Sequence, residues 1–491
     1  MRICYIIFTC EKYLTTRIKY QMNSFLKYVD KNDIFYLANK MDEENRLFAW
    51  DAPDDYKSLP IKYVEFFKKN LINPDDYDWF LLIDDDTFIF KNRVEALLSS
   101  YNCNDNIMIG RELDHIKNTI WGHYMSGGAG TILSRSLYKL LTNFIKSKET
   151  KDILPHWCAD IALSLWIKEL SKNNDVKRID NRDLHCLKHN NNQMLYSALS
   201  FHQVRKYSEF IFFTKVLDNE MNSVVTLITD NKYFHKSKQT IKDLRDKHKG
   251  NWNGDIVLMC IDLTLSEEFK TKYNVTEVHF PEIDKTELLN KIGSGFTNND
   301  GREINKLNQW EKLHAFDDYF KKWSRVIFMD AGLRVVDSIH YLLELDYKNS
   351  FLCPNDAGDG VTKRNPNMLF KTQISYDKPK ITEKLLNELG ADILESYHFL
   401  NCIWVYDTEI LNICNKQDLI DVMNNYPLCK NNEMTAMNIL LNFKHKLWKE
   451  FPEKVLSGEK YLFEWCESNK PGTNWTNYCY LKYPCTISFD I

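Results

Sequence analysis

Residues Tyr77 to Phe90 read YDWFLLIDDDTFIF, in which apolar chain stands on both sides of three consecutive aspartates. The apolar residues predict a buried β-strand and its continuation. Three carboxylates at the end of such a strand repel one another unless a cation offsets their charge. Hard divalent ions such as Mg²⁺ and Mn²⁺ take carboxylate oxygens and leave places for substrate phosphates. The segment therefore favours a metal–phosphate site over the commoner solvated acidic turn.

The length and composition of the chain restrict the class of protein. A chain of 491 residues exceeds the usual size of a single core, so two domains are expected. The net charge of -4 and the scattered Lys and Arg residues give no basic stripe, and we expect no nucleic-acid partner. Thirteen cysteines without a CxxC pair predict neither a zinc site nor a disulfide framework. No stretch is long enough to span a membrane, so we expect no integral membrane segment and a cytoplasmic location.

Two parts of the chain begin in the same way. Ile3–Thr9 and Asn222–Thr229 each predict an apolar strand followed by a helical segment. Each half later has a strand that ends in aspartate, LLIDDD in the first and RVIFMDAG (Arg325–Gly332) in the second. Alternating strands and helices are typical of a mostly parallel sheet covered by helices on both faces. We therefore predict two α/β domains, residues 1–216 and 222–491, with a short linker at Lys215–Met221.

Three further segments follow the aspartates in a characteristic order. They are YMSGGAGTIL (Tyr124–Leu133), CADIALSLWI (Cys158–Ile167) and SFHQV (Ser200–Val204). Together with IDDDTF, this order resembles the Fringe-like β-glycosyltransferases over roughly Met1 to Tyr207. The resemblance implies a GT-A fold, which is Rossmann-like with a mixed sheet flanked by helices. It also implies that a sugar is transferred from a nucleotide diphosphate donor with inversion of its anomeric centre.

The resemblance also implies roles for individual residues. The metal, Mn²⁺ or Mg²⁺, would be bound by Asp86, by Asp84 and by His202, and the donor would contact Thr9, Arg17, Asp84, Asp85, Gly127 and Gly128. Asp160 falls at the position of the catalytic base, although Ala159 replaces the acidic neighbour that commonly precedes this base. Two structural alternatives stay open: His202 as a buried hydrogen-bonded histidine, and the adjacent glycines as a tight turn.

The second half resembles the glycogenin-like glycosyltransferases over about Asn222 to Pro452, more loosely than the first half resembles its family. This resemblance implies donor contacts from Thr226, Lys312, Asp330 and Asn401. Gly332 stands where that family has a second metal-binding aspartate. Three interpretations follow: a weak or substrate-assembled metal site, a metal-free site that uses Lys312 and Arg334, or a noncatalytic scaffold.

The leading functional hypothesis is a bifunctional or two-domain glycosyltransferase with a nucleotide-sugar donor and a glycan, glycoprotein or glycolipid acceptor. One alternative is a single active N-terminal transferase with a noncatalytic donor- or glycan-binding C-terminal domain. A second alternative is a metal-dependent phosphohydrolase, because such enzymes also gather carboxylates around metal ions. A third is a carbohydrate-binding or scaffolding protein with decayed transferase domains.

Overall fold

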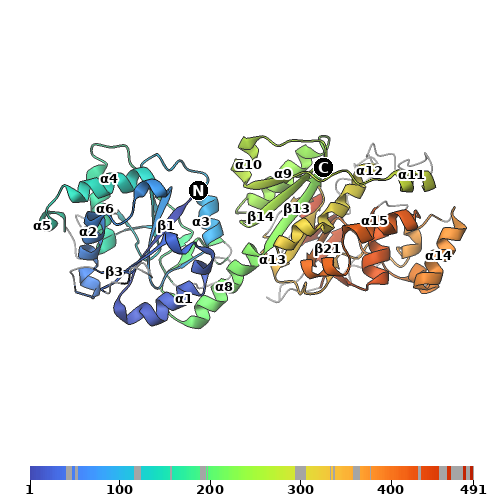
Figure 1. Ribbon diagram of the computed structural model, residues 1–491, viewed down its shortest axis with the longest axis horizontal. Helices are drawn as coiled ribbons and strands as arrows, with labels where there is room; N and C mark the ends of the chain where they lie inside the picture. Colours follow the sequence, from blue (N-terminus) through green and yellow to red (C-terminus); the bar gives the residue numbers. More distant parts are fainter. Residues whose placement is uncertain are drawn as a thin grey trace. The chain divides into compact units, whose positions relative to one another are not determined.

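The chain folds into two compact units, Met1–Asp218 and Asn219–Ile491, in the computed structural model (Figure 1). The residues that the structure describes are all except 40–41, 43–46, 50–52, 115–122, 155–157, 188–194, 196, 293–305, 332, 336–337, 358–364, 376, 429–432, 453–461, 466–478, 483–486 and 490–491. The segment Lys215–Met221, predicted to be a linker, instead forms the end of helix α8 (Tyr207–Met221). One face of α8 is buried through Phe210, Phe213 and Leu217, whereas Ile211 and Phe212 are exposed, and the packing of this buried face explains why the segment is helical.

The first unit is built on a seven-stranded mixed sheet with the order β10-β6-β9-β4-β1-β2-β3. Its strands are β1 (Ile3–Phe8), β2 (Ile34–Leu37), β3 (Leu47–Phe48), β4 (Trp79–Asp84), β6 (Ile107–Gly110), β9 (Thr131–Ser134) and β10 (Lys177–Asp180). Strands β1, β2, β3 and β4 run parallel, and β10 is parallel to β6. Strand β9 is antiparallel to both of its neighbours, β4 and β6.

Helices cover the sheet of the first unit. They are α1 (Lys19–Met22), α2 (Leu59–Lys69), α3 (Lys91–Leu98), α4 (Arg135–Lys146), α5 (Thr150–Ile153), α6 (Ala159–Leu170) and α8. Alternate residues of β1, such as Cys4 and Ile6, share one core with the apolar faces of α2, α4 and α6. This alternation follows from the two-residue repeat of a strand, which points successive side chains to opposite faces.

A small sheet of order β11-β12-β5 adjoins the carboxyl end of β4. Its strands are β5 (Phe88–Ile89), β11 (Leu184–His185) and β12 (Ser200–Phe201). Strand β5 continues the chain after the aspartates and pairs antiparallel with β12, with Phe88 opposite Phe201. A two-stranded sheet is formed by β7 (Glu112–Asp114) and β8 (His123–Met125).

The second unit repeats the sheet of the first. The order of this sheet is β15-β14-β13-β16-β19-β18-β20. Along the chain, its strands are β13 (Ser223–Thr229), β14 (Asp255–Cys260), β15 (Val275–Val278), β16 (Arg325–Met329), β18 (Phe351–Cys353), β19 (Ile403–Asp407) and β20 (Trp448–Glu450). When the seven strands of each sheet are numbered along the chain, both sheets have the order 7-5-6-4-1-2-3. The parallel and antiparallel pairings also match at every step.

The second sheet is likewise covered on both faces. Its helices are α9 (Phe234–Arg245), α10 (Glu267–Tyr273), α11 (Thr286–Ile292), α12 (Lys306–Gln309), α13 (His340–Leu343), α14 (Pro379–Leu389), α15 (Lys416–Asn425) and α16 (Glu433–Met437), with a 3-10 helix η7 (Trp310–Phe316) before β16. On β13, Val224 belongs to the core beneath η7 and α15, whereas Val225 belongs to the core beneath α9. A four-stranded sheet pairs β17 (Leu333–Val335) with β23 (Ile487–Phe489), followed by β22 (Cys479–Lys482) and β21 (Leu462–Trp465).

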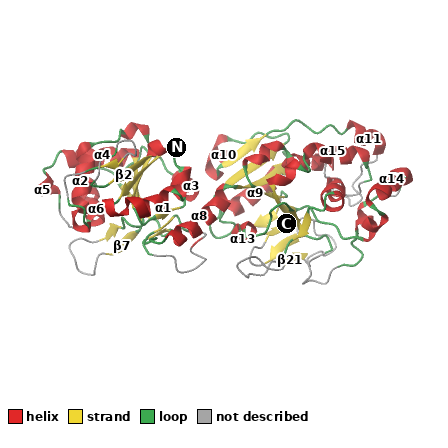
Figure 2. Ribbon diagram, turned by 60° about the horizontal axis from the view of Figure 1, so that its bottom comes forward, coloured by secondary structure: helices red, strands yellow, loops and turns green. Residues whose placement is uncertain are grey.

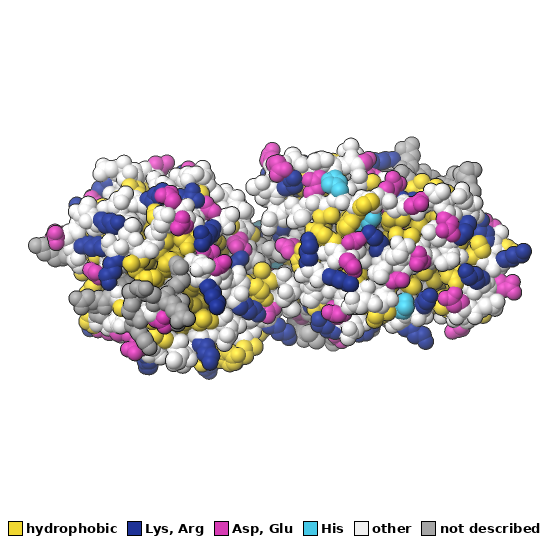
Figure 3. Space-filling model, viewed as in Figure 1, with side chains coloured by type: hydrophobic (Ala, Val, Ile, Leu, Met, Phe, Trp, Pro, Cys, Tyr) yellow, Lys and Arg dark blue, Asp and Glu magenta, His cyan; other side chains and the backbone are white. Residues whose placement is uncertain are grey.

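The predicted fold class, two α/β units in tandem with mixed sheets flanked by helices, is confirmed (Figure 2). Basic and acidic side chains are interspersed on the face drawn in Figure 3, which agrees with the small net charge. Among the described residues, no helix combines the length and the apolar character that a membrane crossing requires.

Candidate active site

The three aspartates lie at the end of β4, next to the point in the first sheet where the strand order reverses. Asp84 is the last residue of β4, and Asp85 and Asp86 form the turn that follows. The neighbouring strand β1 leads on to β2 on its other side, so the crevice between β1 and β4 is a topological switch point. Open α/β sheets bind ligands at the carboxyl ends of their strands at such a point.

Asp85 turns toward the end of β1 and is held by two of the predicted donor-binding residues. The Thr9 hydroxyl donates to Asp85 Oδ2 at 2.7 Å, and Arg17 Nη1 lies 2.7 Å from Asp85 Oδ1. Burial raises the pKa of Asp85, although the bonds from Arg17 and Thr9 act in the opposite direction. This carboxylate therefore fixes Arg17 at the edge of the sheet.

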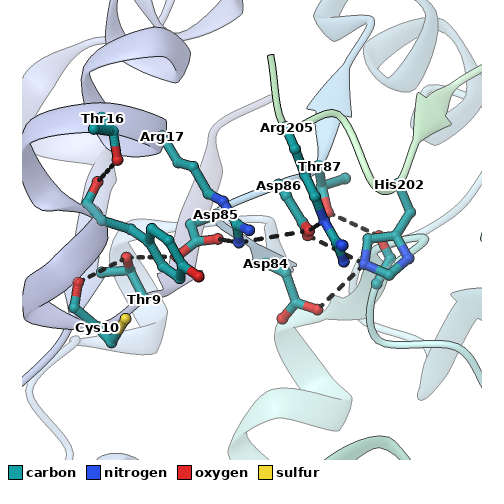
Figure 4. A network of polar contacts seen from close by, with 12 residues as sticks. Thr9, Cys10, Thr16, Arg17, Asp84, Asp85, Asp86, Thr87, His202 and Arg205 are labelled. Carbon is teal, nitrogen blue, oxygen red and sulfur yellow. Dashed lines mark hydrogen bonds and ion pairs between the residues drawn. The ribbon is translucent and has the colours of Figure 1, made fainter. Parts of the chain in front are cut away.

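Asp84, Asp86 and His202 form a cluster of candidate metal ligands (Figure 4). One ligand atom from each residue lies within 4.8 Å of the other two. His202 Nε2 is 3.1 Å from Asp86 Oδ1 and 3.8 Å from Asp84 Oδ2. Within the described parts of the chain, this is the one group of three or more His, Cys, Asp or Glu residues with such geometry.

Backbone pairing places His202 beside residues that are more than 100 positions earlier in the chain. Because β12 pairs with β5, the residue after β12 meets the turn before β5. The His202 N–H donates to the His185 carbonyl at 3.0 Å. His202 Nδ1 lies 3.1 Å from the Cys186 carbonyl, which can only accept, so Nδ1 carries a hydrogen. A carbonyl bound in this way orients the ring and leaves Nε2 as the ligand atom.

The electrostatics of the cluster are set by burial and by the charges of its neighbours. Burial and the neighbouring carboxylates raise the pKa of Asp84 to about 7, although His202 opposes the shift. Burial also acts on Asp86, but hydrogen bonds from His202 and Arg205 outweigh it and hold the pKa of Asp86 below its usual value. Burial lowers the pKa of His202, yet the bond to Asp86 reverses this effect and raises it. Two acceptor-only carboxylates and one imidazole fit a divalent ion.

The two predicted glycines contact the histidine and the candidate base. A Cβ atom on Gly128 would lie 2.3 Å from His202 Cε1, so the imidazole can pack here only because residue 128 is glycine. A Cβ atom on Gly127 would lie 3.3 Å from the Cβ atom of Asp160. The Gly127 N–H donates to Asp160 Oδ2 at 3.2 Å, and Asp160 is the second residue of α6. Asp160 is close enough for its charge to contribute to the raised pKa of Asp84.

Three polar residues near this site were not singled out from the sequence. Arg205 Nε lies 2.8 Å from Asp86 Oδ2, and Gln21 donates to the carbonyls of Asp84 and Thr87. Lys62 is buried, is ion-paired with Asp54, and lies 3.5 Å from the Thr9 carbonyl. Of these three, only Lys62 could have been found from the sequence, because it is a lysine on the apolar face of α2.

The second unit brings together three of its four predicted residues. Lys312 Nζ lies 2.8 Å from Asp330 Oδ1 and 3.1 Å from Glu433 Oε1, and the Asn401 side-chain amide donates to Glu433 at 3.0 Å. Thr226 is not part of this group: it is fully buried in the middle of β13, opposite Phe328.

Two other residues of the second half were considered in the sequence interpretation of this site. Arg334, considered as a partner of Lys312, is ion-paired with Asp243 of α9. Gly332 lies outside the described residues.

Residues 2–221 match the model of the Fringe-like family. This match covers nearly all of the amino-terminal unit, so that unit is similar to the Fringe-like family. Over 151 residues the chain is 27% identical to a glycoprotein-N-acetylgalactosamine 3-beta-galactosyltransferase 1 from Xenopus laevis, a stretch that covers 30% of this chain and 39% of the relative. Over 62 residues it is 39% identical to a human chondroitin sulfate glucuronyltransferase, covering 13% of this chain and 8% of the relative. The chain thus spans less than half the length of either relative.

Among solved structures, the chain is similar to the galactosyltransferase LgtC in complex with donor and acceptor sugar analogues. The identity is 14% and the TM-score 0.30, with 44% of this chain and 70% of that chain covered. A similarity at this level supports no functional conclusion.

Proposed function

We propose that the Fringe-like unit is a glycosyltransferase that moves a sugar from a nucleotide diphosphate donor to a hydroxyl group of a glycan, glycoprotein or glycolipid. The observation that carries this proposal is the Asp84–Asp86–His202 cluster at the switch point of a sheet whose residues match the Fringe-like model. The named relatives, a galactosyltransferase and a glucuronyltransferase, are consistent with this class of reaction.

The cluster would hold Mn²⁺ or Mg²⁺, which as a Lewis acid neutralises charge on the diphosphate. Arg17, held by Asp85 at the edge of the sheet, adds a fixed positive charge on the nucleotide side. Arg205 contacts Asp86 and is 57% exposed, so it can move to a phosphate when the donor arrives. Both arginines would hold the leaving group in place.

Asp160 is our candidate for the catalytic base of an inverting transfer. Its Oδ2 accepts one backbone N–H from Gly127 and lies near the metal cluster. A carboxylate here would take the proton of the attacking hydroxyl, a form of help worth roughly 10²- to 10⁴-fold in rate. Asp160→Asn should therefore lower turnover by about that factor and leave donor affinity nearly unchanged.

The decisive experiment measures transfer and hydrolysis of UDP- and GDP-sugars by the full chain, with Mn²⁺ and with EDTA. We expect turnover with Mn²⁺ that EDTA abolishes and that Asp86→Ala lowers at least 100-fold. Asp75→Ala, which changes an exposed aspartate outside the cluster, is the matched control and should keep full activity. Turnover that persists in Asp86→Ala would exclude the cluster as the active site.

The same samples test the phosphohydrolase alternative. A metal-dependent phosphatase should cleave p-nitrophenyl phosphate, whereas a transferase should not.

Consecutive transfers by both units remain a prediction, and the repeated sheet of the second unit supports this prediction only at the level of architecture.

A further inference from the structure

The second unit has a polar cluster at the place that corresponds to the active site of the first unit. Asp330 directly follows β16, and Asp84 is the last residue of β4. Strands β16 and β4 are each the fourth strand, along the chain, of sheets that have the same order. The Asp330 N–H donates to the Cys402 carbonyl at 2.9 Å, just before β19. In the first unit, Gly127 and Gly128 precede the equivalent strand β9.

Glu433 occupies the position in the second unit that Asp160 occupies in the first. Asp160 lies in the first turn of α6, which packs on α2 and α4. Glu433 begins α16, which packs on η7 and α15, the corresponding helices. Each carboxylate accepts a hydrogen bond from the segment before the sixth strand, from the Gly127 backbone or from the Asn401 side chain.

The chemistry of the two clusters differs in the source of positive charge. In the second unit, the ammonium of Lys312 lies between Asp330 and Glu433, at 2.8 and 3.1 Å. Burial opposes the charge of Lys312, but the two carboxylates outweigh it and raise its pKa. No metal-binding group of three is found in the described part of the second unit. The ammonium group of Lys312 therefore supplies the positive charge that a divalent ion would supply in the first unit.

This cluster suits hydroxyl groups better than phosphates. Two carboxylates and one ammonium leave a net charge of about −1, which repels a diphosphate that brings no metal. Glu433 is 3% exposed, and its Oε2 has no hydrogen-bond partner among the described residues. An unpartnered buried acceptor of this kind destabilises the fold, and a donor is needed to satisfy it. Sugar hydroxyls donate to carboxylates, whereas an ionised phosphate cannot.

We propose that Lys312, Asp330, Asn401 and Glu433 form a saccharide-binding site that needs no divalent cation. Asp330 keeps 23% of its side chain exposed and is the accessible edge of the cluster. The second unit would then bind a glycan while the first unit carries out the transfer. This binding does not depend on activity of the first unit, so the two proposals can fail separately.

The test uses full-length protein with Asp86→Ala, in EDTA, so that the metal site of the first unit is not available. The probe is a glycan array that presents terminal galactose, N-acetylgalactosamine, glucuronic acid, glucose and mannose. We expect binding to at least one terminal sugar, and a loss of at least tenfold on adding Glu433→Gln or Asn401→Ala. Free UDP should not compete.

The matched control is Lys285→Met, which breaks another buried ion pair of the same unit, with Glu311. This variant should retain glycan binding even if it melts earlier, whereas Lys312→Met should lose it. Circular dichroism and the melting temperature of each variant separate a lost site from a lost fold. The proposal is overturned if no glycan binds in EDTA, if Glu433→Gln and Asn401→Ala both bind normally, or if UDP displaces the glycan.

Discussion

At the scale of single residues, Asp84 illustrates how a binding site is held at a cost in stability. Its pKa is raised from 3.8 to about 7 because burial and the other carboxylates disfavour its charge. A carboxyl with a raised pKa binds its proton more tightly in the folded chain than in the unfolded chain. The penalty is therefore absent below about pH 4, grows as the pH rises toward 7, and stays constant above that value.

We expect Asp84→Asn to stabilise the metal-free protein at pH 8 by roughly 1–4 kcal/mol and to have little effect at pH 4. Thermal melts in EDTA at the two pH values measure the difference. In excess Mn²⁺ the original chain should become more stable than Asp84→Asn, because only the original chain has its full set of metal ligands. Equal melting temperatures at pH 8 would show that Asp84 carries no such penalty.

The adjacent glycines give a pair of predictions with different outcomes. Gly128→Ala places a methyl group on the His202 ring, so the ring must shift. We expect Mn²⁺ affinity, measured by titration calorimetry, to fall roughly 10- to 100-fold, as it does when a ligand loses its orientation. In Gly127→Ala the added methyl group contacts Asp160 instead, at a distance that a small shift of the Asp160 side chain can relieve. This variant should keep Mn²⁺ affinity and lose turnover, and the reverse pattern would contradict our placement of the two roles.

At the scale of elements, the small sheet β11-β12-β5 decides whether the histidine reaches the aspartates. Arg93, which is 1% exposed on α3, donates to the carbonyls of Leu195 and Ala198 at 2.6 and 2.7 Å. These bonds fix the segment that leads into β12. The Phe90 N–H adds a bond to the Leu199 carbonyl at 2.9 Å.

Arg93→Met should weaken the metal site from a distance. Two buried carbonyls lose their charged donor, at a cost of about 2–3 kcal/mol in unfolding free energy. We expect Mn²⁺ affinity to fall as well, because β12 no longer fixes His202. Arg2→Met is the control, since Arg2 is an exposed arginine whose loss should leave Mn²⁺ binding unchanged. Denaturant unfolding and a metal titration on the same samples give both quantities.

At the scale of the whole molecule, each unit has core clusters made of its own residues. One core cluster lies entirely in the first unit, and the two clusters of the second unit lie on opposite faces of its sheet. Calorimetry of the full chain should therefore resolve two unfolding transitions. Mn²⁺ should raise only the transition of the first unit, because a ligand stabilises the unit that binds it. A shift of both transitions would point to a second metal site or to strong coupling between the units.

The sequence alone was sufficient for the local structure around the aspartates. YDWFLLIDDDTFIF predicts a buried strand that ends in carboxylates, and β4 and β5 have that form. The matching starts of the two halves predicted the repeated architecture, which appears as two sheets of the same order. Strand periodicity and charge repulsion are properties of neighbouring residues, so a short window of sequence contains them.

Tertiary structure alone decided which distant side chains meet. His202 reaches Asp86 only because β12 pairs with β5, and Glu433 joins Lys312 and Asp330 only because α16 packs on η7. Nothing in the local pattern around Glu433 or Arg205 distinguishes them from surface charges. Thr226 was expected at the donor, but its register on β13 places it inside the sheet. Contacts across 100 residues depend on strand pairing and helix packing, and these are fixed by the fold as a whole.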